Sequence, residues 1–380
     1  MEKTDILIIG AGVIGLAVAR ELSYKDKNII IVEKNMSFGQ ETSSRNSEVI
    51  HGGMYYPVGT LKAELCINGR RLLYKLCAEN SIPHKKTGKL IVATNKNELA
   101  VLEQIAEQGK MNEVEGLEFI AEAKIKKLES EVSAIAALYS NETGIIDSHQ
   151  LMLYLLTAAE NKGVSVVYDA EVIAIEKNSD GYKITVKNSE ENVEIKALIV
   201  INCAGLDSDT IAGMVGIDII KEKYNLYYCK GQYFRLASNK SKLINRLVYP
   251  VPRPKSGGLG IHTTPDLAGS IKLGPDDIYL DNRIKDYSVD EDKKKDFFQS
   301  AMQFIPFLKE ADLIPDTSGI RPKLQPEGGE FRDFIICDEN DKGFPGFINL
   351  IGIESPGLTA SVAIGKKVKN IMANILGIKI

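Results

Sequence analysis

Residues 5–16 read DILIIGAGVIGL, an apolar run of strand length that leads into glycines at positions 10, 12 and 15. A helical pattern follows to about residue 25, and a second apolar run, NIIIVEK, ends near Glu33. Gly10 permits a tight turn, Gly12 lets the backbone approach a pyrophosphate, and Gly15 lets the helix lie close to the sheet. Glu33 stands where an acid meets a ribose hydroxyl. The stretch predicts a strand, turn, helix and strand that bind the ADP part of a dinucleotide.

Composition and charge narrow the class of protein. The chain has 380 residues, which predicts roughly two domains. With 47 Lys and Arg against 51 Asp and Glu, its charge gives no reason to expect nucleic acid or an anionic membrane as a partner. No apolar run approaches the roughly 20 residues of a membrane span, and the first residues lack a signal-peptide pattern. We expect a cytoplasmic enzyme that acts on a small molecule.

The cysteines argue against a metal site. They are spread along the chain without a Cys-x-x-Cys pair, which suits reduced thiols and offers no ligand set. The five are Cys66, Cys77, Cys203, Cys229 and Cys337.

The rest of the chain distinguishes NAD from FAD. A simple nicotinamide dehydrogenase would continue with strands and helices in alternation. Here a polar loop, SSRNSEVIHGG at 43–53, is followed by a helical stretch at 59–80 and by amphipathic helical sequence from about 98 to 131. Strand-like runs return later in the chain, at 164–168, 170–177, 181–188 and 194–205. The nucleotide domain is therefore predicted to be interrupted by other segments, which favours a flavin.

The C-terminal sequence adds a second feature that suits a flavin. The apolar run FINLIGIE leads into Ser355-Pro356-Gly357 and then into a long amphipathic helical pattern. Ser355 is expected to cap this helix, with Pro356 at its first position. A helix start offers free N–H groups and a positive dipole to an anion, and a reduced flavin is negative at N1 and the C2 carbonyl. We therefore predict FAD at this helix start.

These segments together resemble the D-amino-acid oxidase superfamily of FAD enzymes. Within it the chain is similar to L-2-hydroxyglutarate dehydrogenases and their bacterial relatives, and more distantly to glycerol-3-phosphate oxidases. The resemblance rests on GAGVIGLAVARELS, ETSSRNSEVIHGGMYYPVGTLKAELC, KTGKLIVAT, KGQYF, SGIRPKL and NLIGIESPGLTAS, which lie along the whole chain. It implies an α/β fold, with a discontinuous Rossmann-like FAD-binding domain and an α+β substrate domain built on an antiparallel sheet. We assign residues 1–83, 145–212 and 316–380 to the first domain, and residues 84–144 and 213–315 to the second.

The resemblance also implies which residues bind the cofactor. Ser43, Ser44, Arg45 and Asn46 are expected along the pyrophosphate, and residues 47–53 beside the isoalloxazine ring. The chemistry of the loop agrees, because hydroxyl and amide groups suit a diphosphate at the carboxyl edge of a sheet. The full set of expected FAD-binding residues is Gly10, Gly12, Gly15, Glu33, Lys34, Ser43, Ser44, Arg45, Asn46, Ser47, Val172, Ala204, Gly205, Gly352, Gly357, Leu358 and Thr359.

Two histidines are candidates for the base that accepts a hydroxyl proton when an alcohol is oxidised, because imidazole titrates near the working pH. His51 ends the polar loop beside Gly52 and Gly53, and His262 lies in GLGIHTTP on an expected strand of the substrate domain. In an arbitrary protein His51 would be interpreted as a turn residue. We predict that His51 is the base and that His262 contacts the substrate, with the reverse assignment left open.

Arg321, in SGIRPKL, is the candidate for binding a substrate carboxylate, because a planar guanidinium meets a planar anion in a bidentate pair. Tyr55, Tyr249 and Lys230 are further candidates for the substrate pocket. A second carboxylate would need its own cation. The candidates for that cation are Lys230, Arg253 and Lys272.

The expected reaction is oxidation of a small L-2-hydroxy acid, most readily L-2-hydroxyglutarate, to the 2-oxo acid by hydride transfer to flavin N5. Glu354 supports a carboxylate substrate, because the similar glycerol-phosphate oxidases carry lysine there and a carboxylate would repel a phosphate. L-2-hydroxyglutarate dehydrogenases themselves tend to have an alanine-rich sequence at this helix start. An amino acid and glycerol 3-phosphate are the alternative substrates. The expected electron acceptor is oxygen, a quinone or another carrier, with an organic acceptor favoured.

Two other functions fit the sequence less well. A reductase fed by NAD(P)H needs a second dinucleotide fingerprint, and none follows Gly15, since GGLGIH at 257–262 has the wrong spacing. A sensing or assembly module without turnover would not need His51, His262 and Arg321. The sequence therefore disfavours both functions.

Overall fold

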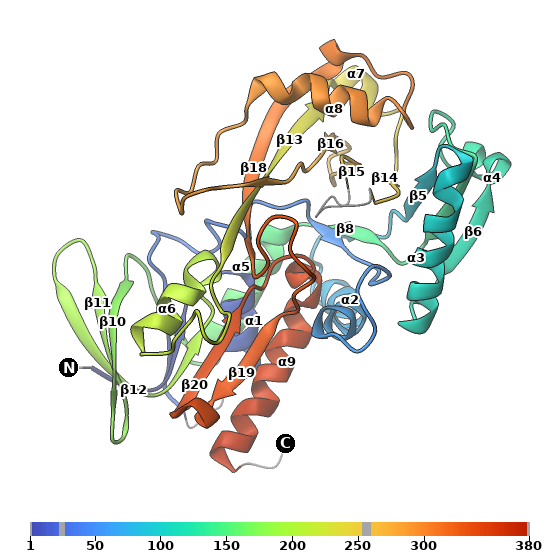
Figure 1. Cartoon of the computed structure of the whole chain (residues 1–380). Coiled ribbons are helices and arrows are strands. Elements are labelled where there is room, and N and C mark those ends of the chain that lie inside the picture. Colours follow the sequence, from blue (N-terminus) through green and yellow to red (C-terminus); the bar gives the residue numbers. More distant parts are fainter. Residues whose placement is uncertain (1, 23–26, 253–259, 378–380) are drawn as a thin grey trace.

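The computed structural model describes residues 2–22, 27–252 and 260–377. These residues form an eight-stranded sheet, a nine-stranded sheet and a three-stranded sheet, with helices packed around them (Figure 1). The predicted α/β class is confirmed.

The eight-stranded sheet contains the strand–turn–helix–strand unit predicted from residues 5–33. Its central strand β1 (Glu2–Ile9) lies between β12 (Asn192–Asn202) and β2 (Ile29–Val32) and is parallel to both. The other strands of this sheet are β9 (Ser165–Val167), β10 (Glu171–Asn178), β11 (Gly181–Lys187), β19 (Ile335–Glu339) and β20 (Phe344–Ile351). The strand-like runs expected between residues 164 and 205 all form strands of this sheet.

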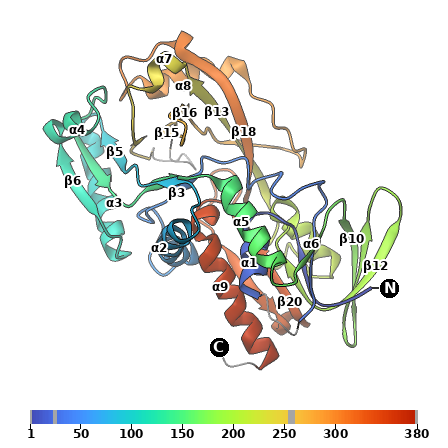
Figure 2. The ribbon, with the colours of Figure 1, turned by 180° about the vertical axis from the view of Figure 1, so that it is seen from behind.

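Helices cover both faces of this sheet, which explains why its inner strands are continuously apolar rather than alternating. α9 (Gly357–Leu376) contacts both α1 (Val13–Leu22) and α2 (Leu61–Glu79), and it lies between them in Figures 1 and 2. α5 (Ser148–Glu160) packs on α1, and α6 (Ser208–Met214) contacts β10 and β20. The buried side chains form one hydrophobic cluster on each face of the sheet.

The glycine turn after β1 is fixed by how closely it approaches the end of β12. Gly10 has a φ of +101°, a conformation that L side chains rarely adopt. A Cβ on Gly10 would lie 2.6 Å from the Cys203 carbonyl oxygen, and a Cβ on Gly15 would overlap the Gly10 oxygen. The first and third glycines therefore let α1 start against the ends of two neighbouring parallel strands.

The nine-stranded sheet lies above the first sheet in Figure 1 and is reached by two long strands. β13 (Tyr227–Leu236) and β18 (Leu313–Lys323) pair antiparallel over most of their length. The other strands are β5 (Lys89–Ala93), β6 (Leu117–Ala121), β7 (Ala136–Ser140), β14 (Leu247–Pro250), β15 (Thr263–Pro265), β16 (Ile271–Leu273) and β17 (Ile278–Tyr279). The expected domain boundary at residue 316 falls inside β18, so this strand belongs to the second sheet as a whole.

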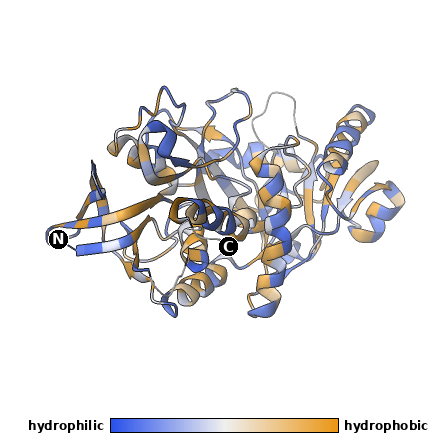
Figure 3. Cartoon of the chain, turned by 90° about the horizontal axis from the view of Figure 1, so that it is seen from below, coloured by the Kyte–Doolittle hydropathy of each residue, from blue (hydrophilic) through white to orange (hydrophobic). Residues whose placement is uncertain are grey.

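Smaller elements complete the chain. The three-stranded sheet consists of β3 (Val49–Ile50), β8 (Gly144–Ile146) and β4 (His84–Lys85). The helices of the second sheet are α3 (Leu99–Met111), α4 (Glu122–Leu128), α7 (Ser238–Ser241) and α8 (Lys294–Ala301). Figure 3 shows hydrophilic and hydrophobic residues alternating along the helices, as expected of elements that cover a core on one side. Among the residues described, no helix is both long and apolar enough to cross a membrane.

The predicted amphipathic helical sequence from about 98 to 131 forms two helices with a strand between them, so the prediction is wrong for residues 117–121. Residues Leu117–Ala121 form the edge strand β6, antiparallel to β7. Ile120 is the buried residue of this edge strand, and Glu118, Phe119 and Ala121 are exposed. Residues 117–121 lie between the helices α3 and α4, but they form a strand because they pair with β7.

The contact between α2 and α9 generates a stability prediction. A Cβ on Gly69, in the middle of α2, would lie 2.5 Å from the Thr359 carbonyl oxygen and 2.7 Å from the Ala360 Cα. Gly69→Ala should therefore lower the free energy of unfolding by about 1–3 kcal/mol, because overpacking forces the two helices apart. Urea unfolding followed by circular dichroism measures this change.

A second helical glycine provides the matched control. Gly213, in α6, would place its Cβ 3.8 Å from the nearest side chain, Ile219. Gly213→Ala should be neutral or stabilise by about 0.5–1 kcal/mol, the ordinary gain of alanine over glycine in a helix. Equal effects of the two substitutions would contradict the packing argument.

Candidate functional site

A cavity of about 810 Å³ lies between the two large sheets. Five segments line it: the turn after β1, the loop 39–51, the end of β12, residues 319–323 of β18 and the start of α9. Most of the residues predicted to bind the cofactor or substrate line it. They are Gly10, Gly12, Glu33, Lys34, Ser43, Arg45, Asn46, Ser47, His51, Tyr55, Val172, Ala204, Gly205, Tyr249, His262, Arg321, Gly357 and Leu358. The predicted residues that do not line it are Gly15, Ser44, Gly352, Thr359 and Lys230.

One end of the cavity has the polar groups of a dinucleotide site. The Glu33 carboxylate accepts hydrogen bonds from the Ala11 backbone N–H at 2.8 Å and from the Asn35 backbone N–H at 3.0 Å. The Ser43 hydroxyl accepts the Val13 N–H at 3.0 Å, and a Cβ on Gly12 would lie 2.9 Å from this hydroxyl oxygen. The glycine turn and the serine loop are therefore held against each other, which leaves no room for a side chain at Gly12.

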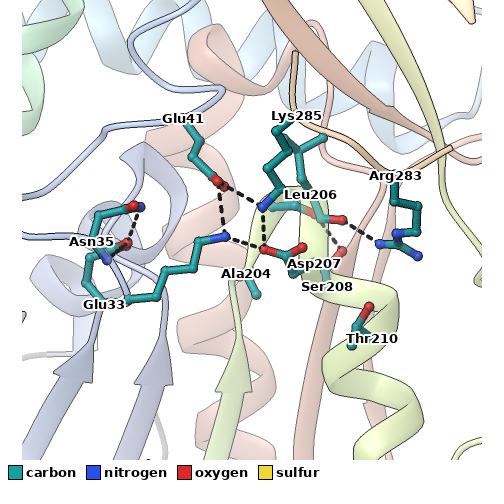
Figure 4. A network of polar contacts seen from close by, with 12 residues as sticks. Glu33, Asn35, Glu41, Ala204, Leu206, Asp207, Ser208, Thr210, Arg283 and Lys285 are labelled. Atoms are coloured by element: carbon teal, nitrogen blue, oxygen red, sulfur yellow. Dashed lines mark hydrogen bonds and ion pairs between the residues drawn. The ribbon is translucent and has the colours of Figure 1, made fainter. Parts of the chain in front are cut away.

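A charged network borders this end of the cavity. Lys34 and Lys285 each pair with both Glu41 and Asp207, at distances of 2.5–3.0 Å (Figure 4). Burial alone would raise the pKa of Asp207, but hydrogen bonds from Lys285 and Lys34 hold it below its usual value. The network joins the loop after β2 to the end of β12 and to the segment after β17. All four side chains line the cavity, so the network closes its edge without adding net charge.

The backbone and the ring of His51 both contact residues at the start of α9. Its backbone N–H donates to the Thr359 hydroxyl at 3.0 Å, and this hydroxyl donates to the Val49 carbonyl at 3.1 Å. Its Nε2 lies 3.2 Å from the Ser355 hydroxyl oxygen. Burial first, and then the nearby Lys89 and His262, lower the pKa of His51 to about 3. The imidazole is therefore neutral near pH 7, and one of its ring nitrogens carries no proton.

The expected capping role of Ser355 is wrong. α9 begins at Gly357, its N-cap residue is Pro356, and no side chain caps it. The Ser355 hydroxyl contacts His51 instead. Thr359, predicted at the cofactor, lies behind His51 and fixes the backbone of the loop.

His262 has a free acceptor in the same cavity. Its Nδ1 lies 2.8 Å from the Gly260 carbonyl oxygen, which requires Nδ1 to carry the proton. The buried Nε2 has no hydrogen-bond partner among the residues described. The ring stacks on Tyr249 with a centroid separation of 3.6 Å, and burial lowers the pKa of His262 to about 3. His262 immediately precedes β15, so it lies beside the expected strand rather than on it.

Behind these histidines lies a buried lysine that sequence reasoning missed. The Lys89 side chain is buried, and its Nζ has no hydrogen-bond partner in the described part of the chain. Nζ lies 4.7 Å from the ring centroid of Tyr55 and 4.5 Å from that of Tyr249. Burial lowers the pKa of Lys89 to about 7. The signal in the sequence was a lysine at the head of the apolar strand KLIVA.

Arg321 lines the cavity but already has protein partners. Its Nη2 lies 2.6 Å from the Asp277 carboxylate and donates to the Asp276 carbonyl at 2.8 Å. Its Nε donates to the Cys229 carbonyl at 3.4 Å, and within the described residues Nη1 donates no hydrogen bond. Arg321 can therefore offer Nη1 to an anion, while a fully bidentate pair requires Asp277 to move.

Two of the three cations expected for a second carboxylate do not line the cavity. Lys230 pairs with Asp286 at 2.6 Å outside the lining, and Lys272 lines a separate small pocket. Arg253 lies outside the described residues. Besides Lys34 and Lys285 of the charged network, Lys62 and Lys323 line the cavity. Lys323 had a signal in the sequence, because it follows Arg321 by two residues and thus lies on the same face of β18.

Glu354 is paired with both of these lysines, at 2.9 Å to Lys62 and 3.0 Å to Lys323. Its charge is therefore compensated by the protein. The expectation that this carboxylate would simply repel a phosphate needs correction, because the cluster as a whole carries one positive charge.

Comparisons with known proteins agree with this geometry. Residues 5–371 match the sequence profile of the family described as FAD dependent oxidoreductase. A protein of Arabidopsis thaliana named L-2-hydroxyglutarate dehydrogenase, mitochondrial, is 39% identical over 97% of this chain and 83% of its own length. A glycerol 3-phosphate dehydrogenase of Caloramator mitchellensis is 32% identical over 98% of this chain and 74% of its own length. The dithionite-reduced L-alpha-glycerophosphate oxidase of Mycoplasma pneumoniae, solved with FAD bound, superposes with a TM-score of 0.87 at 28% identity, covering 100% and 96% of the two chains.

The unpartnered Lys89 generates a prediction on stability and pH. Its pKa in the folded chain is about 7, against 10.5 for an ordinary lysine. The unfolded chain therefore binds more protons between these pH values, so the stability penalty of Lys89 is full below pH 7 and shrinks as the pH rises toward 10.5. Lys89→Met should raise the melting temperature clearly at pH 6 and less at about pH 9.5. Differential scanning fluorimetry at the two pH values measures this.

Lys230→Met is the control, because it removes another buried lysine, one that has an ion-pair partner. It should lower the melting temperature or leave it unchanged at pH 6. A Lys89→Met variant that is less stable than wild type at pH 6, by as much as at pH 9.5, would contradict the account of Lys89.

Proposed function

The chain belongs to the FAD dependent oxidoreductase family, and we propose that it oxidises a small L-2-hydroxy acid, most readily L-2-hydroxyglutarate, to the 2-oxo acid. One observation carries the proposal: two neutral imidazoles, of which His262 is buried and His51 half-buried, line the same cavity as a guanidinium. Oxidation of a 2-hydroxy acid needs a proton acceptor at the hydroxyl group and a cation at the carboxylate. The name of the Arabidopsis thaliana relative supports the same substrate.

Separate groups of residues hold the cofactor and the substrate in this proposal. The first sheet supplies the cofactor site through Gly10, Gly12, Glu33 and Ser43, and the start of α9 offers its N–H groups to the flavin. The second sheet supplies Arg321, Tyr249 and His262. The proposed division into two domains follows this division of labour except at β18, because the boundary at residue 316 assigns Arg321 to the first domain while its strand pairs in the second sheet.

Bound FAD supplies the hydride acceptor of the reaction. Arg321 would bind the C1 carboxylate and fix the orientation of C2. As the hydrogen on C2 leaves with its electron pair, His51 would take the hydroxyl proton, and the C2–O bond becomes a carbonyl. Burial makes an imidazolium costly, but the negative charge of the bound carboxylate favours it. His262 is the rival base, because its Nε2 has no partner among the described residues.

The acceptor and the location belong to the same proposal. An organic acceptor such as a quinone would reoxidise the enzyme in preference to oxygen. All five cysteines are free thiols, which suits a reducing compartment, and we propose the cytoplasm.

Glycerol 3-phosphate is the second candidate substrate. Two of the similar proteins are named for it, and the Lys62–Lys323 pair could bind an anion other than a carboxylate. Anaerobic flavin reduction separates the two candidates. L-2-hydroxyglutarate should bleach the visible flavin band at a saturable rate, while glycerol 3-phosphate should not; bleaching by glycerol 3-phosphate or by a neutral amino acid alone would overturn the proposal.

Substitutions at Arg321 and His51 should affect different kinetic parameters. Arg321→Met removes a cation that binds ground and transition states alike, so it should chiefly raise the substrate concentration needed for half-maximal flavin reduction, by about tenfold or more. His51→Ala should lower the limiting rate of reduction by about 10²–10⁴-fold, since a general base acts mainly in the transition state. Anaerobic stopped-flow measurements give both parameters.

His262→Ala is the companion variant. If it lowers the limiting rate while His51→Ala reduces the flavin as fast as wild type, His262 is the base. If neither variant changes the limiting rate, the proposed proton transfer to imidazole is wrong.

A further inference from the structure

Three buried charged residues form a compact cluster on the wall of the cavity. The Glu354 carboxylate bridges the Lys62 and Lys323 ammonium groups, one oxygen to each, at 2.9 and 3.0 Å. All three side chains are only 5–7% exposed. They come from α2, from β18 and from the segment before α9, so the chain brings them together from three distant places.

The cluster lies next to the groups that would bind and oxidise the substrate. Ser355, the residue after Glu354, contacts His51, and Lys323 follows Arg321 on the same face of β18. The fields of Lys62, Lys323 and Arg321 together offset burial and hold the pKa of Glu354 below its usual value, so Glu354 remains a carboxylate. Arg321, His51 and the three residues of the cluster all line the same cavity, so the cluster faces the space that a ligand of Arg321 and His51 would occupy.

The charges of the cluster do not cancel. Two ammonium groups face one carboxylate, and the nearby Arg321 is matched by Asp277. The Asp333 carboxylate accepts the backbone N–H groups of Leu61 and Lys62 at the start of α2, and within the described residues it forms no ion pair with the Lys62 ammonium group. One buried positive charge is left over, and an uncompensated buried charge is costly.

Each lysine also retains capacity for another acceptor. An ammonium group has three donors, and the hydrogen bond of Lys62 Nζ to Glu354 uses one of them. Lys62 otherwise lies over the rings of Phe331 and Phe334, at 5.2 and 5.3 Å. Within the described residues, Lys323 has no ion-pair partner other than Glu354.

We propose that Lys62, Lys323 and Glu354 form a second anion subsite, which binds the distal carboxylate of the substrate and is set by Glu354 to accept one negative charge rather than two. Without Glu354 the two lysines would match the dianion of a phosphate monoester; with it, the surplus matches a monoanionic carboxylate. The inference rests on the proposed oxidation of a hydroxy acid. It adds the residues that would distinguish a hydroxydicarboxylate from a hydroxymonocarboxylate and from a phosphate ester.

The first experiment compares two substrates that share the reacting end. L-2-hydroxyglutarate carries the distal carboxylate, and L-2-hydroxybutyrate lacks it. Lys323→Met should lower kcat/KM for L-2-hydroxyglutarate by at least about tenfold, the loss of one charge-assisted hydrogen bond, and leave kcat/KM for L-2-hydroxybutyrate within about twofold. Lys323→Arg should restore most of the difference. Equal losses on both substrates, or no loss on either, would overturn the subsite while the proposed function stands.

The second experiment changes the charge of the subsite. Glu354→Gln keeps the shape of the side chain and raises the surplus to two positive charges. The ratio of kcat/KM for L-2-hydroxyglutarate to that for glycerol 3-phosphate should fall by at least about tenfold. An unchanged ratio in a folded variant would contradict the role of Glu354. Lys230→Met, outside the cavity, should leave both the ratio and the substrate preference as in wild type.

Binding measurements keep the test independent of turnover. Isothermal titration calorimetry of the FAD-loaded protein with glutarate and with butyrate compares a dicarboxylate with a monocarboxylate, neither of which can be oxidised at C2. Glutarate should bind at least about tenfold tighter to wild type, and Lys323→Met should abolish the difference. If wild type reduces no flavin with hydroxy acids yet shows this difference, the proposed function fails and the subsite stands. Equal affinities in wild type would overturn the subsite.

Discussion

The short segment from Glu354 to Thr359 holds the site together. Glu354 bridges two lysines from other elements, Ser355 contacts the His51 ring, and Thr359 bonds to the backbone on both sides of Ile50. The segment can do this because α9 is packed tightly against its neighbours, where Gly69 of α2 meets the Thr359 carbonyl and Gly365 meets the Ala17 carbonyl. Backbone contact at these crossings fixes where α9 starts, and the start of α9 fixes the histidine and the lysine pair.

Burial gives the polar groups of the cavity their chemistry. Desolvation is the largest cause of the lowered pKa values of His51, His262 and Lys89, and it disfavours the charged form of each. The two imidazoles of the cavity are thus neutral near pH 7, while Arg321, Lys62 and Lys323 are paired with carboxylates. This separation assigns neutral groups to proton transfer and cations to anion binding, and both kinds of group line one cavity.

The sequence predicted the parts of the structure that depend on local pattern. The glycine turn, β1, α1 and β2 follow from short-range spacing, and the polar loop containing His51 was assigned to the cavity because it follows β2. The lysine pair could not be found in this way, because Lys62 and Lys323 lie far apart in the chain and meet only through Glu354. The prediction that Lys230 binds substrate has the same weakness, because its ion-pair partner Asp286 lies far away in the sequence. The two residues meet only because β13 pairs with β17. The sequence around Ser355 is typical of a helix N-cap, yet the Ser355 hydroxyl contacts the His51 ring instead.

A crystal structure of the FAD-loaded enzyme with 2-oxoglutarate bound would test the central claim most directly. The account predicts the C1 carboxylate against Arg321, the C2 oxygen within hydrogen-bond reach of His51 or His262, and the C5 carboxylate against Lys323. A product bound with its C2 oxygen away from both histidines, or with neither carboxylate on Arg321, would contradict it.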